Sequence, residues 1–549
     1  MNKMPTFRTT IAAVVALAAL VAGGALMQRA ATAQEAEAFD RAQLRRVERI
    51  IGERYVEVVD TDQLYQMAID GMLDRLGDPH STFIDATEAT DLEITTTGNY
   101  GGLGIRVQMV GKWVTVMSVI VGTPAEREGL LAGDRIVGVE GESVEGWDEG
   151  RVIDRLRGPV GEPVMVSVER TGAPAAIHLT ITRDQIHVPP VLAYMVDDNI
   201  GTARLSQFSR EATTELREAI QGLVESGATS LVLDLRGNPG GLLEEGVAVS
   251  DLFLTRGTPI ASTSSRIEDQ KYTFVATEDD EFPGLPIVVL VNGASASAAE
   301  IVAGALQDHD RALILGTPSF GKGSMQTVYL LPGGHRLKLT TAAWYTPSGR
   351  SIQRERRASG VSVEVADRQV ALPPGHQPVP DAERETFRTT GGRLVSGGGG
   401  IVPDVVIADS LTDAEREFGA ELTRNALSIR QLAFRFAVRW NGEHPDLPRE
   451  FVVTPEMRAQ FRELLAEEGA QIDDELYGSV QQLVDRFLAV QLANTALGEL
   501  EGLRRSQREE RQVLEAIQLL REATTVEDLL KAAGAGETQT EPPETAATG

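Results

Sequence analysis

Apolar residues near the start of the chain recur at helical spacing, between positions 44 and 51 and again between 64 and 72. A turn signal follows at residues 78–81, which have the sequence DPHS. We therefore expect a helical amino-terminal region over residues 34–87.

From about residue 88 the apolar pattern changes to short runs separated by turns that contain glycine. Runs of this kind are typical of strands. Four of them stand out, at residues 104–107, 114–116, 135–139 and 164–168. Gly111 and Lys112 suit a hairpin between the first two runs, and residues 149–156 suit a short helix. The pattern predicts a β-rich module over residues 88–185.

Strands then alternate with helices up to about residue 353, which is typical of α/β layering. Residues 231–235 and 287–291 are continuous apolar runs, as expected for strands that are covered on both faces. Residues 212–225 and 298–307 fit helices that follow these strands or lie between them. Layers of this kind predict an α/β core.

The predicted core extends over residues 190–410. Its stretch 354–400 is rich in Gly, Pro and Arg, and we expect an irregular excursion there. Residues 411–533 return to a helical pattern and form a predicted helical carboxyl-terminal region. Residues 534–549 are poor in apolar side chains, so we expect a disordered tail.

Two helices of the carboxyl-terminal region begin with capping signals. Thr412 and Glu415 have the spacing of a capping box, and Thr454 suits an N-cap before Pro455. The apolar face of the second helix consists of Phe461, Leu464 and Leu465. We expect such faces to support a dimer or a higher assembly rather than a separate catalytic role.

The amino terminus has the order of an export signal. The basic residues Lys3 and Arg8 come before an uncharged run of mostly Ala, Val and Leu over residues 11–27. Residues 31–33 then have the small side chains of a signal-peptide cleavage site. We expect residues 1–33 to direct the protein out of the cytoplasm, to the periplasm. The alternative is a retained membrane anchor that faces outside the cytoplasm, because the apolar run is near the lower length limit for spanning.

The chain of 549 residues is strongly acidic, with 52 Lys and Arg against 80 Asp and Glu and a formal net charge of −28. Residues 1–33 contain three basic residues and no acidic one, so their removal would change −28 to −31. A nucleic-acid partner is not expected, since binding phosphates needs a basic surface.

The absence of cysteine excludes a disulfide, a thiolate nucleophile and a Cys-ligated metal. With 54 glycines, the composition points to catalysis by oxygen or nitrogen groups held on tight turns. The seven histidines are scattered; His309 with Asp310, at a helix end, is expected to be a solvated pair. The sequence leaves a Ser-His-Asp triad open, although no pattern favours one.

The first candidate for chemistry is the segment 291–300, VNGASASAAE, which joins a buried strand to a helix. A serine at such a junction lies near unpaired N–H groups and the positive end of the helix dipole, which favour a developing oxyanion. The competing interpretation is that Ser295 or Ser297 is an ordinary N-cap.

The second candidate is Lys322, which lies between two glycines after the apolar run 312–315. A desolvated lysine loses its proton more readily and can then act as a general base. Gln326 lies four residues further on, and one helical turn would place it beside Lys322. The competing interpretation is a lysine on a surface loop.

The third candidate is the segment 234–241, DLRGNPGG, at the carboxyl end of a predicted strand. Glycines there allow N–H groups to point into a site, and ligands of open α/β sheets commonly bind at strand carboxyl ends. An ordinary strand-to-helix turn is the alternative.

Taken together, these segments resemble the carboxyl-terminal processing peptidases, the tail-specific S41-type serine proteases that combine a PDZ domain with a Ser/Lys dyad. The motifs that carry the resemblance follow in order: DPHS at 78–81, YGGLGI at 100–105, GTPA at 122–125, GLLAGD at 129–134, LSQF at 205–208, DLRGNPGG at 234–241, SASAAE at 295–300, FGKG at 320–323 and YTPSGRSIQ at 345–353. The resemblance weakens after residue 404. The chain departs from the family motif at Ala299, where the family has a serine that is not the nucleophile.

The resemblance implies a multidomain α+β protein, with a PDZ-like β-rich module and a crotonase/ClpP-like α/β protease core between helical amino- and carboxyl-terminal regions. It implies Ser297 as the nucleophile, Lys322 as the base and Gln326 as the residue that orients the base. The backbone N–H groups expected in the oxyanion hole are those of Ala298, Gly240 and Gly241. The loop expected to bind a substrate carboxylate consists of Leu103, Gly104 and Ile105.

The expected substrates are proteins and peptides with apolar carboxyl ends, with an adaptor protein and self-association into a homo-oligomer as further partners. No metal and no cofactor are expected. One alternative is a catalytically inactive PDZ-containing scaffold that binds an adaptor. An acyl-CoA enzyme of crotonase-like layering is disfavoured, because CoA is cytosolic and this chain has an expected export signal.

Overall fold

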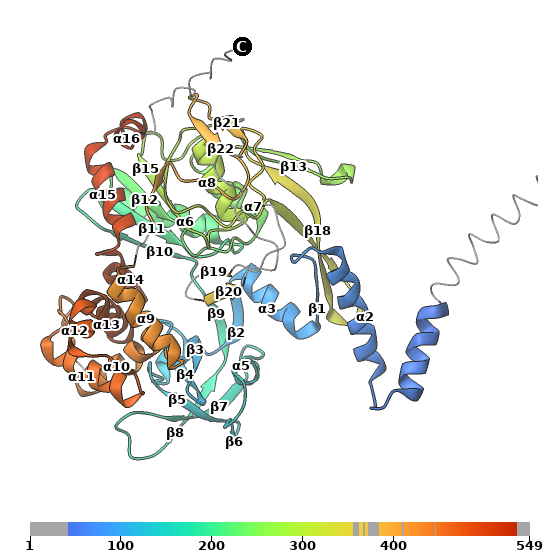
Figure 1. The fold of residues 1–549 in the computed structure, drawn as a ribbon, viewed down its shortest axis with the longest axis vertical. Coiled ribbons are helices and arrows are strands. Elements are labelled where there is room, and N and C mark those ends of the chain that lie inside the picture. Colours follow the sequence, from blue (N-terminus) through green and yellow to red (C-terminus); the bar gives the residue numbers. More distant parts are fainter. Residues whose placement is uncertain are drawn as a thin grey trace, which may run out of the picture. The chain divides into compact units, whose positions relative to one another are not determined.

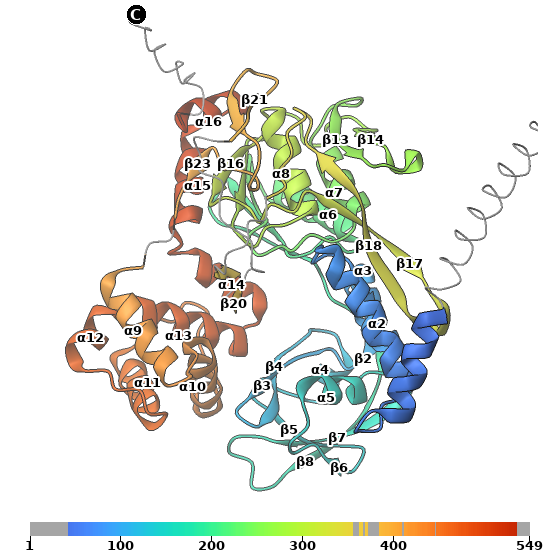
Figure 2. The same cartoon turned by 45° about the vertical axis from the view of Figure 1, so that its right-hand side comes forward.

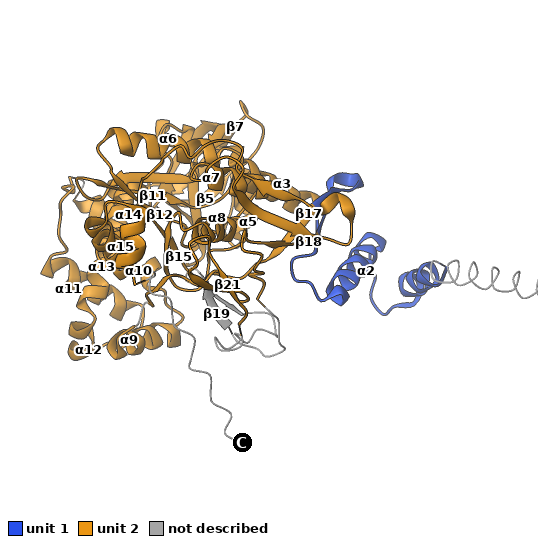
Figure 3. Cartoon of the chain, turned by 90° about the horizontal axis from the view of Figure 1, so that it is seen from above, with its two compact units in different colours: residues 1–85, 328–339 blue, residues 86–327, 340–549 orange. Residues whose placement is uncertain are grey.

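The computed structural model describes residues 42–354, 362–365, 368–371, 384–408, 411–444 and 446–534. The predicted export signal, and the predicted tail beyond Gly534, lie outside the described residues. Two compact units are present (Figure 3): unit 1 comprises residues 1–85 and 328–339, and unit 2 comprises residues 86–327 and 340–549. Among the described residues, we find no helix with the length and apolar character needed to cross a membrane.

The amino-terminal region of unit 1 is helical, as its sequence pattern predicts. Residues 42–54 form one helix, and α2 (Thr61–Leu76) forms the next. Asp60 caps α2 by accepting from the N–H of Asp62 at 3.1 Å, and the helix ends at Gly77 with φ of 66°. The strand β1 (Thr82–Ile84) pairs with residues 336–338 of β18 (Arg336–Tyr345).

The β-rich module lies in unit 2, and all neighbouring strands of its main sheet are antiparallel (Figure 1). The strand order is β3-β4-β5-β7-β8, with β6 beside β5, so β3 lies at an edge of the sheet. The strands are β3 (Ile105–Val110), β4 (Trp113–Val119), β5 (Arg135–Val139), β6 (Glu142–Ser143), β7 (Pro163–Glu169) and β8 (Ile177–Thr182). The predicted hairpin at Gly111 and the predicted helix 149–156, which is α5 (Glu149–Leu156), are both present.

Four further elements frame this module. The helix α3 (Ala86–Thr97) precedes it, α4 (Pro124–Arg127) follows β4, and β2 (Asn99–Gly102) pairs with β9 (Asp184–His187). The pairing of β2 with β9 brings the start and the end of the module together.

The α/β core of unit 2 is a six-stranded sheet in the order β10-β11-β12-β15-β16-β23. All neighbouring strands are parallel except β10 and β11. The strands are β10 (Val191–Met195), β11 (Ile200–Leu205), β12 (Ser230–Asp234), β15 (Ile287–Val291), β16 (Leu313–Gly316) and β23 (Val405–Val406). The helices are α6 (Ala212–Glu225), α7 (Leu243–Asp251), α8 (Ala298–Asp308), α15 (Arg511–Glu522) and α16 (Val526–Ala532).

Helices cover both faces of this sheet (Figure 2). In β15, the side chains of Ile287, Val289 and Val291 belong to a buried cluster with α6, α7 and α8. Val288 and Leu290 point the other way, into a buried cluster with α15 and α16. A continuous apolar run is therefore buried on both faces, as predicted. Most apolar side chains of α15 and α16 are buried in this cluster, so their main apolar faces are not free to support self-association.

A second sheet contains long-range pairs that the apolar pattern did not indicate. It has the order β1-β18-β13-β14, with β17 also beside β18. Its remaining strands are β13 (Pro259–Ser264), β14 (Thr273–Val275) and β17 (Ser324–Leu330), with short 3₁₀ helices η1 (Glu268–Gln270) and η2 (Pro332–Gly334).

The prediction that residues 354–400 are irregular is wrong at four short strands. This stretch contains two hairpins, formed by β19 (Ser362–Val365) with β20 (Arg368–Ala371) and by β21 (Thr386–Arg388) with β22 (Leu394–Ser396). Strands of three or four residues are too short to produce a readable alternation of apolar and polar positions.

Five helices of the carboxyl-terminal region share a hydrophobic cluster of their own. They are α9 (Asp413–Arg424), α10 (Ile429–Glu443), α11 (Pro455–Glu467), α12 (Asp474–Ser479) and α13 (Gln481–Ala496). The helix α14 (Glu499–Gln507) follows them. The predicted capping box is confirmed: Thr412 accepts from the N–H of Glu415 at 3.1 Å, and Glu415 accepts from the N–H of Thr412 at 2.8 Å. Thr454 caps α11, and Phe461 in that helix is fully buried.

Candidate active site

Ser297 occupies the N-cap position of α8, directly after the tight turn that follows β15. Its backbone has φ of 55° and ψ of −114°, a conformation that costs a residue with a side chain about 1–3 kcal/mol. Within residues 294–300 it alone is not buried. Strain of this kind clusters at functional sites, and here it presents a serine side chain at the positive end of a helix.

The other candidate serine, Ser295, has a structural role. Its buried hydroxyl donates to the carbonyl of Leu235 at 2.8 Å and accepts from the N–H of Asn292 at 2.9 Å. These bonds join the segment after β15 to the segment after β12. Of the two serines, only Ser297 keeps a side chain that reaches the surface.

The loop that carries Lys322 is bound to the turn that carries Ser297. Phe320 donates its N–H to the carbonyl of Ser295 at 3.0 Å, and the indole N–H of Trp344 donates to the carbonyl of Lys322 at 3.0 Å. Lys322 is half-buried. It therefore lies in a packed segment beside the predicted nucleophile, and its role as a base stays a prediction.

The expected helical turn between Lys322 and Gln326 is absent, since residues from Ser324 onward form the strand β17. The side-chain amide of Gln326 donates to Ser324 at 3.0 Å and to Thr340 at 3.1 Å. A strand prevails here because β17 forms a hairpin with β18, which in turn pairs with β1 and β13, strands that are distant in sequence. The role of Gln326 in orienting Lys322 stays a prediction.

The glycine turn after β12 lies against the predicted nucleophile. A Cβ on Gly240, where φ is 95°, would lie 2.8 Å from the Cβ of Ser297 and 3.0 Å from the nitrogen of Ala298. The N–H of Gly240 donates to Asn238 Oδ1 at 2.8 Å, so an oxyanion would have to displace this acceptor. The N–H of Ala298 is in the first turn of α8, where helix N–H groups have no acceptor within the helix. The roles of Ala298, Gly240 and Gly241 remain predictions.

The start of this turn is held by a buried ion pair. Asp234 is fully buried and pairs with Arg236 at 2.8 Å, and Arg236 also pairs with Glu510 at 2.7 Å. Burial alone would raise the pKa of Asp234, but the Arg236 guanidinium holds it below its ordinary value. Through Glu510, the N-cap residue of α15, the pair fastens the glycine turn to the start of that helix.

Glu300 is the residue of this site that sequence reasoning missed. Its fully buried carboxylate accepts hydrogen bonds from the N–H groups of Ser297, Gly321 and Lys322 and from the Ser319 hydroxyl. Burial raises the pKa of Glu300, and the four hydrogen bonds oppose this rise. The spacing of Ser297 and Glu300 is that of a capping box, which is the signal that could have found it.

The predicted carboxylate loop lies where the β-rich module begins its main sheet. Leu103 is buried, and Ile105 begins the edge strand β3. Gly104 has φ of 85°, and a Cβ there would lie 2.3 Å from the side chain of Thr123. Only glycine fits this position without a shift. The role of this loop in binding a substrate carboxylate stays a prediction.

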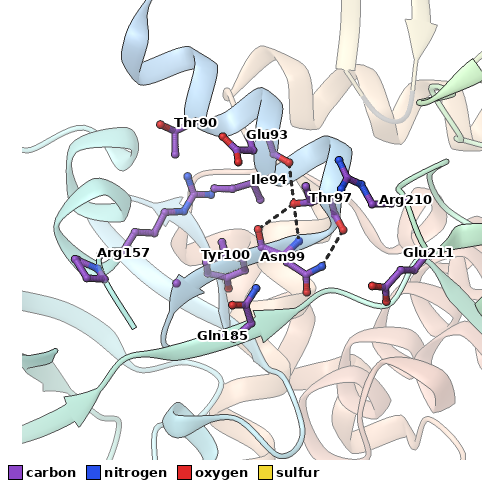
Figure 4. Close-up of a pocket in the computed structure, with 13 residues that line it drawn as sticks. Thr90, Glu93, Ile94, Thr97, Asn99, Tyr100, Arg157, Gln185, Arg210 and Glu211 are labelled. Atoms are coloured by element: carbon purple, nitrogen blue, oxygen red, sulfur yellow. Dashed lines mark hydrogen bonds between the residues drawn. The ribbon is translucent and has the colours of Figure 1, made fainter. Parts of the chain in front are cut away.

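A pocket of about 670 Å³ lies apart from these residues (Figure 4). It is lined by residues from α3, by Asn99 and Tyr100 of β2, and by the Arg210–Glu211 segment before α6. Neither Ser297 nor Lys322 lines it. Beside it, within the described part of the chain, His187, Glu211 and Glu215 form one group that could hold a metal ion. His187 Nε2 and Glu215 Oε1 lie 2.9 Å apart, so the two side chains already contact one another directly.

His309 is unsuited to act on Ser297, because it lies at the opposite end of α8. This helix has 11 residues and is therefore about 16 Å long. The prediction of a solvated His309–Asp310 pair is wrong. His309 contacts the carbonyl of Pro259 at 2.7 Å, and Asp310 pairs with Arg393 at 2.6 Å.

The comparisons with known proteins agree with the order of these modules. The family model described as Peptidase family S41 matches residues 199–365, the PDZ domain model matches residues 115–170, and the model of the activating protease CtpB N-terminal domain matches residues 18–88. A PDZ domain and an α/β core of this kind define a serine-type peptidase.

The similar proteins include carboxy-terminal processing proteases. That of Bartonella bacilliformis is 45% identical over 304 residues, which cover 55% of this chain and 69% of the relative. CtpA of Bacillus subtilis is 36% identical over 313 residues, 57% of this chain and 66% of the relative. The solved photosystem II D1 C-terminal processing protease is 30% identical, covers 61% of this chain and 86% of its own, and gives a TM-score of 0.34. The chain belongs to the family of carboxy-terminal processing proteases.

Proposed function

We propose that this protein is an exported endopeptidase that recognises protein carboxyl ends through its PDZ domain and cleaves them with a Ser297/Lys322 dyad. The observation that carries the proposal is the junction of the two segments. Ser297 and Lys322 both donate their backbone N–H to one oxygen of Glu300, at 2.8 and 2.9 Å. Two segments far apart in sequence are thereby held side by side.

The proposed reaction begins when neutral Lys322 takes the proton from Ser297 Oγ, which attacks the scissile carbonyl carbon. The resulting oxyanion is stabilised by the N–H of Ala298 and by the turn of Gly240 and Gly241. The C–N bond breaks as the amine takes the proton from Lys322, which leaves an acyl-enzyme. A water molecule, deprotonated by Lys322, then releases the acyl group and restores Ser297.

The experiment that tests this function compares two peptides with the same sequence and an apolar carboxyl end. One has a free terminal carboxylate and the other has a terminal amide. Mass spectrometry of the products should show efficient cleavage of the first peptide by the purified chain and much slower cleavage of the second. If neither is cleaved although the first is bound, the chain is a scaffold rather than an enzyme.

Substrate capture is proposed at the edge strand β3, to which a peptide adds as a further strand while the loop at Leu103–Ile105 holds its carboxylate. Beyond this loop, the N–H of Met109 donates to Glu149 at 2.6 Å, so this part of the edge is already bonded. The peptide would thus pair along the first half of β3.

Replacement of Gly104 is expected to weaken tail binding. In Gly104→Ala the added methyl group meets Thr123 and the positive φ becomes unfavourable, so the loop must shift. The affinity for a fluorescent apolar-tailed peptide, measured by anisotropy, should fall about tenfold, which corresponds to about 1.4 kcal/mol. Gly111→Ala is the matched control: it also has a positive φ of 63°, but no heavy atom lies within 4 Å. Equal loss in both variants would contradict the assigned loop.

Export and self-association are also proposed. Sequencing the amino terminus of the mature protein tests whether residues 1–33 are removed.

Self-association is proposed through unit 1, because α2 buries none of its side chains and exposes 59% of Met67 and 63% of Met72. Sedimentation velocity would contradict this part of the proposal if the full chain stays monomeric.

A further inference from the structure

Glu300 is a fully buried acid in a helix whose other residues from Ala298 to Leu306 are small or apolar. An ionised carboxylate in such surroundings is strongly unfavourable unless hydrogen bonds replace its hydration. Four donors do so here, from Ser297, Ser319, Gly321 and Lys322. One carboxylate and four hydrogen-bond donors therefore hold together the segments of Ser297 and Lys322.

Each carboxylate oxygen of Glu300 accepts two of these four hydrogen bonds. Oε2 accepts from the backbone N–H groups of Ser297 and Lys322, at 2.8 and 2.9 Å. Oε1 accepts from the Ser319 hydroxyl at 2.5 Å and from the Gly321 N–H at 2.6 Å. One oxygen atom thus fixes the main chain of the proposed nucleophile relative to that of the proposed base, and the other fixes the loop before the base.

The bond to Ser297 also supports a backbone that would otherwise relax. A residue with a side chain keeps a φ of 55° only where its surroundings hold it there. Loss of the acceptor would remove one such restraint, and a rotation of the backbone would carry Ser297 Oγ away from its present position.

We propose that Glu300 is a positioning residue for the reaction, because its carboxylate sets the geometry of Ser297 and Lys322 through their main chains. This inference rests on the proposed function, since it presupposes the roles of these two residues. Glu300 makes no proton transfer in it and need not touch the substrate.

The test is Glu300→Gln in the full chain. Glutamine replaces one of the two acceptor oxygens with an amide NH₂, so at least one backbone N–H would face another donor and the loop or the turn must shift. A misplacement of about 1 Å lowers catalysis on the order of 100-fold, so kcat should fall by that amount. The rate at which a fluorophosphonate labels Ser297 should fall in parallel, while KM and the affinity for an apolar-tailed peptide stay near their wild-type values.

Asp308→Asn is the matched control for stability. Asp308 lies at the other end of α8, is 1% exposed, and pairs with Arg350 at 2.7 Å, but it has no bond to Ser297 or Lys322. This variant should lower the thermal unfolding temperature at least as much as Glu300→Gln, and its kcat should stay near that of the wild type.

The positioning role of Glu300 and the proposed peptidase function fail in different ways. If Glu300→Gln keeps the wild-type kcat and labelling rate, or if Asp308→Asn loses as much of both, the positioning role is overturned. If Glu300→Gln does not fold, Ser319→Ala decides, because it removes one donor from the same carboxylate; an unchanged kcat and labelling rate there overturn the inference. If the wild type is not labelled, or Ser297→Ala still cleaves, the proposed function itself has failed.

Discussion

Ser297→Ala is expected to abolish peptide cleavage while the fold stays intact. The substitution removes the oxygen that would form the acyl-enzyme, and loss of a serine nucleophile lowers kcat on the order of 10⁴-fold or more. Alanine is smaller than serine and keeps the backbone N–H that bonds to Glu300, so the turn has no steric reason to change. Cleavage of an apolar-tailed peptide and mass-spectrometric detection of an acyl-enzyme are the measurements.

Ser295→Ala is the control that separates the two serines. Its hydroxyl makes two buried hydrogen bonds, to Leu235 and Asn292, so the substitution should destabilise the protein by about 1–3 kcal/mol. It should nevertheless leave cleavage measurable below the unfolding temperature. An active Ser297→Ala enzyme beside an inactive but folded Ser295→Ala enzyme would reverse the assignment.

The sequence predicted the elements of the core whose signals are local. The run 287–291 is the strand β15 within the same limits, and residues 212–225 are the helix α6. Both depend on apolar positions that a short window contains. The motif at 295–300 likewise predicted a strand-to-helix junction, because small residues followed by a helical pattern have few other conformations.

The sequence does not predict which strands and helices pack together when they are far apart along the chain. The strand β18 pairs with the distant strands β1 and β13 as well as with β17, and this sheet takes the place of the helical turn expected around Gln326. The sequence predicts helices over residues 411–533, but only the structure shows that α15 packs on the sheet with Val288 and Leu290. Glu300 was missed for the same reason: three of its four donors lie about 20 residues away.

Lys322→Met is the second variant expected to lose activity. Methionine keeps much of the side-chain length and removes the amine, and general-base catalysis contributes about 10²–10⁴ to the rate, so kcat should fall within that range. The backbone N–H that bonds to Glu300 is unchanged, which leaves the main chain of the site in place. The rate of cleavage of an apolar-tailed peptide measures the effect, and Lys271→Met, at an exposed ion pair with Glu268, should have no effect.

Lys322→Arg distinguishes a base from a merely positive residue. A guanidinium keeps the charge and hydrogen-bond donors but stays protonated, so it cannot take the proton of Ser297. This variant should therefore be as inactive as Lys322→Met. In the wild type, kcat/KM should rise with pH toward a plateau, because only the deprotonated amine is competent, and this rise should be absent from the residual activity of either variant. Substantial activity in Lys322→Arg would mean that Lys322 acts through its charge, and Ser297 would then need another base.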